Sequence, residues 1–200
     1  MARALSVGAV MAYPSETSYA LGGNALDAAL VAKIFPLKGR SAAKALPVLI
    51  DGARGLESFA DSPHPGALLL AERFWPGPLT MVVQAGPAIP LHLRDRRGTV
   101  ALRWSPHPVI AELLAVGGVP LIGTSANAAG AGPSHSLEEV LAAFGGALAL
   151  AVDGGATSGA PPSTLLDTTT RPFRLLREGE ISTQTLREAL READPEVAPE

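Results

Sequence analysis

The chain has 200 residues, of which 47% are hydrophobic and 18% are charged, and its formal net charge is −3. This length suits a single domain, and this composition can bury a core, which excludes an intrinsically disordered chain. The absence of cysteine excludes disulfides, thiol nucleophiles and cysteine-based metal sites, and the negative net charge argues against non-specific binding of nucleic acid.

Helical and strand-like patterns alternate along the chain, which predicts an α/β domain. The expected strands, in chain order, are residues 8–13, 46–50, 79–84, 99–104, 119–122, 148–152, 164–167 and 173–176. The expected helices carry their apolar residues on one face and comprise residues 28–35, 66–74, 109–116, 136–144 and 183–193. Residues 1–182 are expected to form one domain, followed in residues 183–200 by a C-terminal helix and an acidic tail that frays.

Particular residues mark where these helices begin and end. Asp27 is a candidate N-cap of the first helix, and Pro36 is expected to stop it, because proline removes a backbone donor. The sequence Ser-Pro-His-Pro occurs twice, at residues 62–65 and 105–108, and each copy precedes a predicted helix. Proline is favoured in the first helical turn, so we interpret both copies as helix-entry segments and not as a repeat.

Common catalytic and membrane signals are weak or missing. No phosphate-binding loop of the type Gly-x-x-x-x-Gly-Lys-Ser/Thr and no Gly-x-Gly-x-x-Gly turn occurs. Residues 123–127 resemble the turn that carries the serine nucleophile of some hydrolases, but Asn127 stands in place of its closing glycine, which disfavours a serine hydrolase. The four histidines are far apart, so we expect no metal ligands. No apolar run is long enough for a membrane span, and we expect a cytoplasmic protein.

Small hydroxyl and basic side chains recur where predicted strands end. They lie in residues 13–17, at Lys38, Arg40 and Lys44, in residues 99–103, in residues 123–127, and at Ser163 and Thr164. In open α/β sheets, ligands bind in the crevice beyond the strand ends. Hydroxyls, an amide and guanidinium groups that converge there would suit a phosphate-bearing ligand beside a small zwitterion.

Each of these segments also has a purely structural interpretation. The basic residues around Lys38 could form a solvated helix end, and Ser125 and Asn127 could stabilise a turn. Arg103 is harder to explain in this way, because strand alternation places it on one face with the other odd-numbered residues of its strand. If that face is interior, the charge of Arg103 requires an anionic partner.

Seven short motifs cover most of the chain in a fixed order. They are residues 13–22 (YPSETSYALG), 37–40 (LKGR), 74–80 (FWPGPLT), 99–103 (TVALR), 125–127 (SAN), Ser163 and Thr164 with Asp167, and 176–179 (LREG). Together they resemble the motifs of the YrdC-type L-threonylcarbamoyladenylate synthases, in the family's short, single-domain form. The chain departs from the family pattern, in ways that bear on substrate affinity more than on reaction type, at Ser15, Ala20, Ser41, Ala45 and Pro162.

The resemblance implies a fold and an activity. The fold would be a twisted mixed β-sheet flanked by helices around a positively charged cavity, with residues 1–182 as the catalytic domain. The activity would be that of a nucleotidyltransferase, which condenses L-threonine, bicarbonate or CO2, and ATP into L-threonylcarbamoyl-AMP and releases pyrophosphate. Other proteins, the tRNA threonylcarbamoyl-transferases, would then pass the threonylcarbamoyl group to an adenosine of tRNA in the t6A modification.

The resemblance also assigns roles to residues. The catalytic residues would be Lys38, Arg40 and Arg103. The L-threonine site, in which Arg103 faces the carboxylate, would comprise Thr17, Arg103 and Ser163. The ATP site would comprise Lys38, Arg40, Lys44, Thr99, Ser125, Asn127 and Arg177. ATP would enter as its magnesium complex, with no organic cofactor and no metal ligand from the protein.

Two other functions are compatible with these motifs. A non-catalytic RNA-binding or ribosome-maturation module could use the same positive concavity, although the chain has only two tryptophans, two tyrosines and five phenylalanines to stack on bases. A carbamoyl-transfer domain that uses carbamoyl phosphate shares related motifs, but the zinc-finger and acylphosphatase segments of that system are absent from this sequence. Product analysis with ATP, bicarbonate and threonine distinguishes the three functions.

Overall fold

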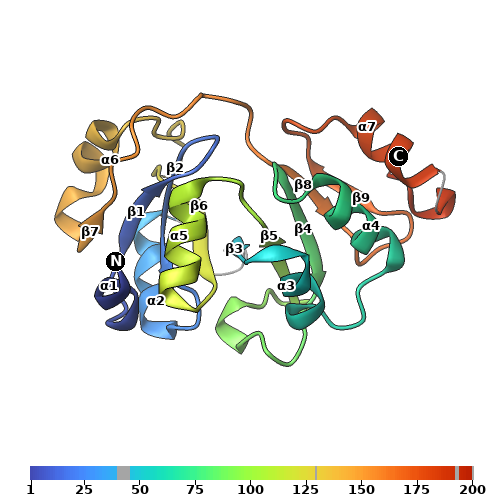
Figure 1. Ribbon diagram of the computed structural model, residues 1–200, viewed down its shortest axis with the longest axis horizontal. Helices are drawn as coiled ribbons and strands as arrows, with labels where there is room; N and C mark the ends of the chain where they lie inside the picture. The colour runs from blue at the N-terminus through green and yellow to red at the C-terminus, as the bar shows by residue number, and fades with distance from the viewer. Residues whose placement is uncertain (40–45, 129, 192–193, 200) are drawn as a thin grey trace.

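A nine-stranded mixed sheet runs through the part of the chain that the structure, a computed structural model, describes (Figure 1). The described residues are 1–39, 46–128, 130–191 and 194–199. The strands lie in the order β7-β1-β2-β6-β3-β5-β4-β8-β9. Their bounds are β1 Met11–Pro14, β2 Tyr19–Asn24, β3 Val48–Leu49, β4 Leu79–Gln84, β5 Thr99–Arg103, β6 Leu121–Ser125, β7 Leu150–Ala151, β8 Thr164–Asp167 and β9 Arg174–Arg177.

The helices are interspersed among these strands along the chain. They are α1 Ala2–Ser6, α2 Ala28–Leu37, α3 Gly52–Phe59, α4 Pro65–Phe74, α5 Pro108–Gly117, α6 Leu137–Phe144 and α7 Thr183–Arg191. Within the described ranges, three short 3-10 turns accompany them, η1 Leu91–Leu93, η2 Gly145–Ala147 and η3 Pro195–Val197. Among the described residues, we find no helix with the length and apolar character that a membrane crossing requires.

The sheet combines antiparallel and parallel neighbours. The pairs β1–β2, β2–β6, β3–β6, β4–β5 and β8–β9 are antiparallel, whereas β1–β7, β3–β5 and β4–β8 are parallel. The two-residue strand β3 joins the group β7-β1-β2-β6 to the group β5-β4-β8-β9, which form the left and right halves of Figure 1. Val48 of β3 lies opposite both Leu102 of β5 and Ile122 of β6. A short strand therefore connects the two halves of the sheet.

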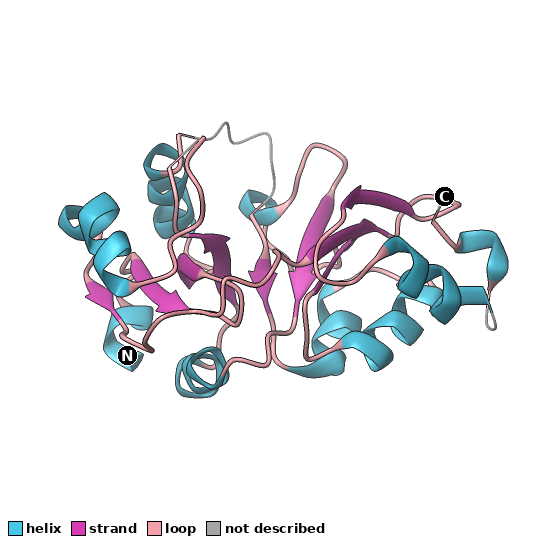
Figure 2. Ribbon diagram, turned by 90° about the horizontal axis from the view of Figure 1, so that it is seen from above, coloured by secondary structure: helices cyan, strands magenta, loops and turns pink. Residues whose placement is uncertain are grey.

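Helices pack against both faces of the sheet. Met11 and Tyr13 of β1 pack with residues of α1 and α5, whereas Ala12 between them packs with Val140 and Phe144 of α6. Successive side chains of a strand point to opposite faces, so β1 is covered on both sides. The largest cluster packs α2, α3, α4 and α7 against the sheet, and Figure 2 shows helices on both sides of the strands.

Several predicted elements are confirmed. The strands β4 and β8 coincide with the predicted strands 79–84 and 164–167. Asp27 caps α2, because its side chain accepts hydrogen bonds from the backbone N–H groups of Ala29 and Leu30. At these two strands and at the start of α2, the local sequence alone was enough to predict the structure.

The two Ser-Pro-His-Pro segments are helix entries, as predicted. His64 precedes α4, and its Nδ1 accepts a hydrogen bond from the backbone N–H of Gly66 at 3.1 Å. His107 precedes α5, and its Nδ1 accepts a hydrogen bond from the backbone N–H of Val109 at 3.3 Å. The proline after each histidine occupies the first helical turn. Both histidines therefore act as helix caps.

The prediction that Pro36 stops the first helix is wrong. α2 continues to Leu37, and the backbone N–H of Lys38 still donates to the carbonyl of Ile34. The next residue, Gly39, has a φ of 57°, a conformation that ends helices readily. A proline in the last turn gives up only one backbone hydrogen bond, so the helix tolerates it.

Four further elements also differ from prediction. Residues 8–13 were expected to be a strand, but β1 begins later and the helix α1 precedes it. The strand β2 and the helix α3 were not predicted at all. A pair of glycines lowers the strand propensity of β2, yet a side chain at Gly22 would overlap the carbonyl oxygen of Ile122 in β6. Glycine is required there because the two backbones approach closely.

The prediction that the acidic tail frays is wrong for residues 194–199, the part of the tail that the structure describes. Val197 in η3 is fully buried in the largest hydrophobic cluster. The backbone N–H of Phe173 donates to the carbonyl of Val197 at 3.0 Å, and Nε of Arg187 donates to the carbonyl of Pro199 at 2.7 Å. One buried apolar side chain and two contacts to the main chain anchor the segment.

Replacing Val197 with alanine tests this anchoring. We expect Val197→Ala to lower the free energy of unfolding by about 1–3 kcal/mol, because two buried methyl groups are lost. Urea denaturation followed by circular dichroism measures the change. Val116→Ala, at a position that is 48% exposed, is the matched control and should have almost no effect. Equal stability of the two variants would mean that the tail is not docked.

Candidate active site

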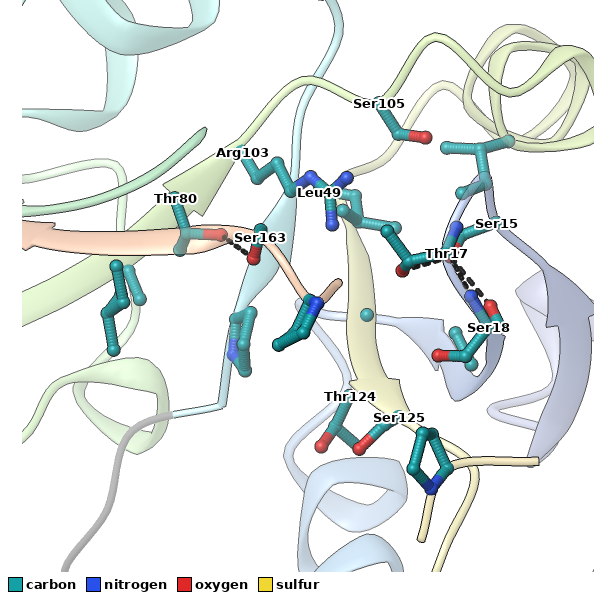
Figure 3. A pocket seen from close by; sticks show the side chains of 18 of the residues that line it. Ser15, Thr17, Ser18, Leu49, Thr80, Arg103, Ser105, Thr124, Ser125 and Ser163 are labelled. Atoms are coloured by element: carbon teal, nitrogen blue, oxygen red, sulfur yellow. Dashed lines mark hydrogen bonds between the residues drawn. The ribbon is translucent and has the colours of Figure 1, made fainter. Parts of the chain in front are cut away.

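A cavity of about 370 Å³ lies across the middle of the sheet, where β2, β6, β3, β5, β4, β8 and β9 all contribute side chains (Figure 3). Its polar lining consists of Ser15, Thr17, Ser18, Thr80, Arg103, Ser105, Thr124, Ser125, Ser163 and Arg177. Its apolar lining includes Leu49, Ala101, Ile110 and Leu165. A cavity of this size, with a few polar groups on apolar walls, is typical of a site for a small ligand.

The alternation of β5 carries Arg103 into this cavity. Ala101 and Arg103 line the cavity, whereas Val100 and Leu102 belong to the largest hydrophobic cluster. Side chains of opposite parity therefore occupy opposite faces of the strand, as predicted.

Arg103 is almost fully buried, with 8% of its surface exposed. Its Nε donates a hydrogen bond to the carbonyl of Gly77 at 3.1 Å, and its Nη2 forms an ion pair with Oε1 of Glu16. Burial lowers the pKa of Arg103 to about 10, while the charge of Glu180 opposes this decrease and the charge of Arg177 adds to it. Arg103 therefore remains a cation at neutral pH, and the anionic partner that its interior position requires is Glu16.

Glu16 was not among the residues predicted for the site. Its Oε2 accepts a hydrogen bond from the hydroxyl of Ser105 at 2.7 Å, while its Oε1 faces Arg103. Its main-chain carbonyl accepts a hydrogen bond from the hydroxyl of Ser158 at 2.7 Å. The sequence signal was an acidic residue enclosed by hydroxyl residues in the first motif, a pattern that a surface loop shows equally well.

The structure brings together the three residues predicted to bind L-threonine. Thr17 and Ser163 line the same cavity as Arg103. The hydroxyl of Ser163 lies 2.8 Å from the hydroxyl of Thr80, and Nη2 of Arg177 donates to the carbonyl of Ser163 at 2.8 Å. Arg177, predicted to contact ATP, therefore reaches the cavity beside Ser163.

Lys38, Ser125 and Asn127 form a second group at the cavity. Nζ of Lys38 donates hydrogen bonds to the carbonyl of Ser125 at 2.5 Å and to Oδ1 of Asn127 at 2.8 Å. Lys38 is buried, so a solvated helix end is wrong for this residue. Ser125 lines the cavity, and both Lys38 and Asn127 are hydrogen-bonded to Ser125. Three of the residues predicted for ATP thus lie together.

Three other predicted residues are not placed at the cavity. Arg40 and Lys44 lie outside the described residues. Thr99 is at the opposite end of β5 from Arg103, where it pairs with Gln84, and it is not part of the cavity lining. The predicted contact of Thr99 with ATP has no support from this geometry and stays a prediction.

Few charged side chains line the described part of the cavity. Among the described lining residues, Arg103 and Arg177 are the charged ones, and Arg103 is paired with Glu16. The positively charged cavity that the resemblance implies is therefore not confirmed by the described residues.

Asp167, from the sixth motif, lies in a separate polar cluster. It is fully buried, and its carboxylate accepts hydrogen bonds from Arg97 at 2.8 Å and from the hydroxyl of Thr169 at 2.6 Å. Burial alone would raise the pKa of Asp167, but the hydrogen bonds from Thr169 and Arg97 outweigh burial and lower the pKa. Arg97 also pairs with Asp95, which accepts the backbone N–H of Thr99. Through Arg97, Asp167 therefore links β8 to the segment that leads into β5.

Comparison with known proteins identifies the family. The Sua5/YciO/YrdC family model, described as telomere recombination, matches residues 3–179. The chain belongs to this family. A threonylcarbamoyl-AMP synthase of Pyrococcus abyssi is 36% identical over 185 residues, which are 92% of this chain and 54% of that protein. A putative threonylcarbamoyl-AMP synthase of Mycobacterium tuberculosis is 35% identical over 187 residues, which are 94% of this chain and 86% of that protein.

Solved structures confirm the fold of this Sua5/YciO/YrdC protein. P. abyssi Sua5 complexed with L-threonine superimposes with a TM-score of 0.91 at 34% identity, covering 100% of this chain and 57% of that chain. E. coli YciO superimposes with a TM-score of 0.85 at 23% identity, covering 92% of this chain and 90% of that chain, and shows the fold alone. The chain thus spans about half the length of the P. abyssi relative. The mixed α/β sheet with flanking helices is confirmed.

Replacing Asp167 with asparagine tests the polar cluster. We expect Asp167→Asn to lower the free energy of unfolding by about 1.5–3 kcal/mol near neutral pH, because an amide cannot replace a charged acceptor for Arg97 and Thr169. The folded-state pKa of Asp167 is lowered, so its contribution is present above about pH 4 and is lost as the pH falls through the folded-state value.

Urea denaturation at a series of pH values measures both proteins. The stability difference between the wild type and Asp167→Asn should shrink as the pH falls below about 4 and through the lowered folded-state pKa of Asp167. Asp51→Asn, which changes an exposed carboxylate, is the control and should show no such pH dependence. A stability difference that is constant across the pH series would contradict this assignment.

Proposed function

We propose that this Sua5/YciO/YrdC protein is an L-threonylcarbamoyl-AMP synthase that uses L-threonine, bicarbonate or CO2, and ATP. The observation that carries the proposal is the buried guanidinium of Arg103, which shares a cavity with the hydroxyls of Thr17 and Ser163. A cation beside hydroxyl groups suits the carboxylate and polar groups of a small amino acid. The relatives named threonylcarbamoyl-AMP synthase, and the Sua5 structure with L-threonine, support the same function.

The proposed reaction needs no covalent intermediate with the protein. The amine of threonine captures CO2, loses a proton and becomes a carbamate, and a carbamate oxygen attacks the α-phosphorus of ATP. The bond from the α-phosphorus to the bridging oxygen breaks, and pyrophosphate leaves with the bonding electrons. The product keeps the AMP group, so the protein would be a nucleotidyltransferase. The proposed work of the side chains is to position the reactants and to offset charge as it develops.

We propose a place for each substrate among the described residues. We assign the carboxylate of L-threonine to Arg103, and its remaining polar groups to Thr17 and Ser163. We assign ATP to the part of the cavity formed by Ser125, with its attached Lys38 and Asn127, and to Arg177. Arg40 and Lys44 stay predicted contacts of the triphosphate. All of the described lining residues fall within residues 1–182, the proposed catalytic domain.

The lining also bears on magnesium. The described lining residues include no carboxylate, the ligand type that magnesium prefers from proteins. We therefore propose that magnesium enters with the triphosphate and is bound by phosphate oxygens and water. The product, an activated carbamate, would pass to tRNA threonylcarbamoyl-transferase proteins for t6A formation.

Product analysis tests the function directly. The purified protein is incubated with MgATP, L-threonine and bicarbonate, and threonylcarbamoyl-AMP and pyrophosphate are quantified by mass spectrometry and a coupled assay. We expect both products, in equal amounts, only when all three substrates are present. Pyrophosphate release that does not depend on threonine would contradict the proposal, as would formation of no adenylate.

Replacing Arg103 tests the residue on which the proposal rests. We expect Arg103→Ala to lower the rate of threonylcarbamoyl-AMP formation by a factor on the order of 100 to 1,000, because the carboxylate loses its cationic partner. Arg96→Ala, at an exposed arginine outside the cavity, is the matched control and should keep the wild-type rate. Circular dichroism confirms that both variants fold. A folded Arg103→Ala variant with a nearly wild-type rate would remove Arg103 from the site.

A further inference from the structure

We propose that Glu16 is a positioning residue, whose carboxylate holds the guanidinium of Arg103 in the orientation that receives the carboxylate of the amino-acid substrate. This inference rests on the proposed function and adds a residue that the sequence motifs did not assign. Glu16 is itself not part of the cavity lining, so it would act through Arg103.

The contacts of Arg103 fix two of its three nitrogens. Nε is held by the carbonyl of Gly77 at 3.1 Å, and Nη2 is held by the ion pair with Glu16. A guanidinium is a planar fork, so contacts at two nitrogens determine the direction in which the third points. Figure 3 shows the side chain extending from β5 into the cavity, with Ser163 on one side and Thr17 on the other. None of the contacts within the described residues uses Nη1.

Glu16 is held at both its side chain and its main chain. Its second carboxylate oxygen accepts a hydrogen bond from Ser105, whose hydroxyl also accepts the backbone N–H of His107 at 3.2 Å. Its carbonyl accepts a hydrogen bond from Ser158. Each carboxylate oxygen of Glu16 therefore has its own partner, and the next residue along the chain, Thr17, lines the cavity.

These contacts decide between two roles for Glu16. If Glu16 only occupied the substrate's place on Arg103, it would compete with the substrate carboxylate, and its loss would improve substrate binding. The anchoring by Ser105 and Ser158 instead keeps Glu16 to one side, where it orients the guanidinium and offsets the cost of burying it. The loss of Glu16 should therefore weaken substrate binding.

Substitution of Glu16 by glutamine separates these roles. Glu16→Gln keeps the size of the side chain and one acceptor oxygen but removes the charge. We expect the KM for L-threonine to rise on the order of 10- to 100-fold, because the guanidinium loses its fixed orientation. The KM for ATP should stay within about twofold, since no adenosine or phosphate group is assigned to Glu16 or Arg103.

Two further variants make the test specific. Ser105→Ala removes the support of Glu16 while leaving the ion pair, so it should raise the KM for L-threonine in the same direction but by less. Glu112→Gln makes the same chemical change on the exposed face of α5 and should leave both KM values unchanged. Thermal unfolding of every variant shows whether it is folded. If Glu16→Gln does not fold, the KM values of Ser105→Ala test the proposal instead.

The outcomes separate this inference from the proposed function. An active wild type, with an unchanged or lowered threonine KM in the Glu16 and Ser105 variants, overturns the role of Glu16 and leaves the proposed function standing. A wild type that forms no threonylcarbamoyl-AMP overturns the proposed function. Calorimetric titration of L-threonine into the wild type and Glu16→Gln then decides the inference: weaker binding to the variant supports it, while equal, tighter or wholly absent binding overturns it.

Discussion

The need to give one buried guanidinium an anion and a carbonyl shapes the whole site. Arg103 cannot lie inside the sheet without partners, because desolvation of a charge costs far more than desolvation of a neutral polar group. The turn at residues 74–80 supplies one partner, the carbonyl of Gly77. The backbone N–H of Gly77 in turn donates to the carbonyl of Trp104 at 2.8 Å, directly after Arg103 in the chain. Two hydrogen bonds therefore join the turn at residues 74–80 to the end of β5, although the two segments are far apart in sequence.

The site also depends on how the two halves of the sheet meet. Glu16 follows β1 in one half, whereas Arg103 ends β5 in the other half, so their ion pair crosses the middle of the sheet. The two-residue strand β3 supplies the main-chain pairing between the halves. A short connection of this kind leaves space beside it, and the cavity occupies that space with residues from both halves. Lys38 lies at the end of α2. Its hydrogen bond to the carbonyl of Ser125 links this helix to the end of β6.

Much of the fold could be predicted because local signals agreed with the tertiary structure. The strand β5 shows the pattern most clearly, since its alternation predicted the face on which Arg103 lies, and the burial of that face brings the need for an anion. The strand β2 could not be predicted, because Gly22 is required by the close approach of Ile122, a contact between segments far apart in the chain. The fraying predicted for the tail was wrong for a similar reason, since the burial of Val197 depends on the packing of other elements.

The site, like the fold, could be predicted from the sequence only in part. Residues predicted from their place at strand ends, such as Arg103 and Ser163, do meet in one cavity. Thr99 has the same parity as Arg103 but lies at the other end of the strand, so parity alone did not bring it into the cavity lining. Glu16 could not be assigned from sequence, because its partners Arg103 and Ser105 lie in a distant part of the chain.

A crystal structure with L-threonine and a non-hydrolysable ATP analogue tests the central claim most directly. The account predicts that the threonine carboxylate accepts hydrogen bonds from Arg103 inside the cavity, while Glu16 keeps its contacts with Arg103 and Ser105. Threonine bound elsewhere, with the guanidinium of Arg103 in contact only with Glu16 and Gly77, would contradict it.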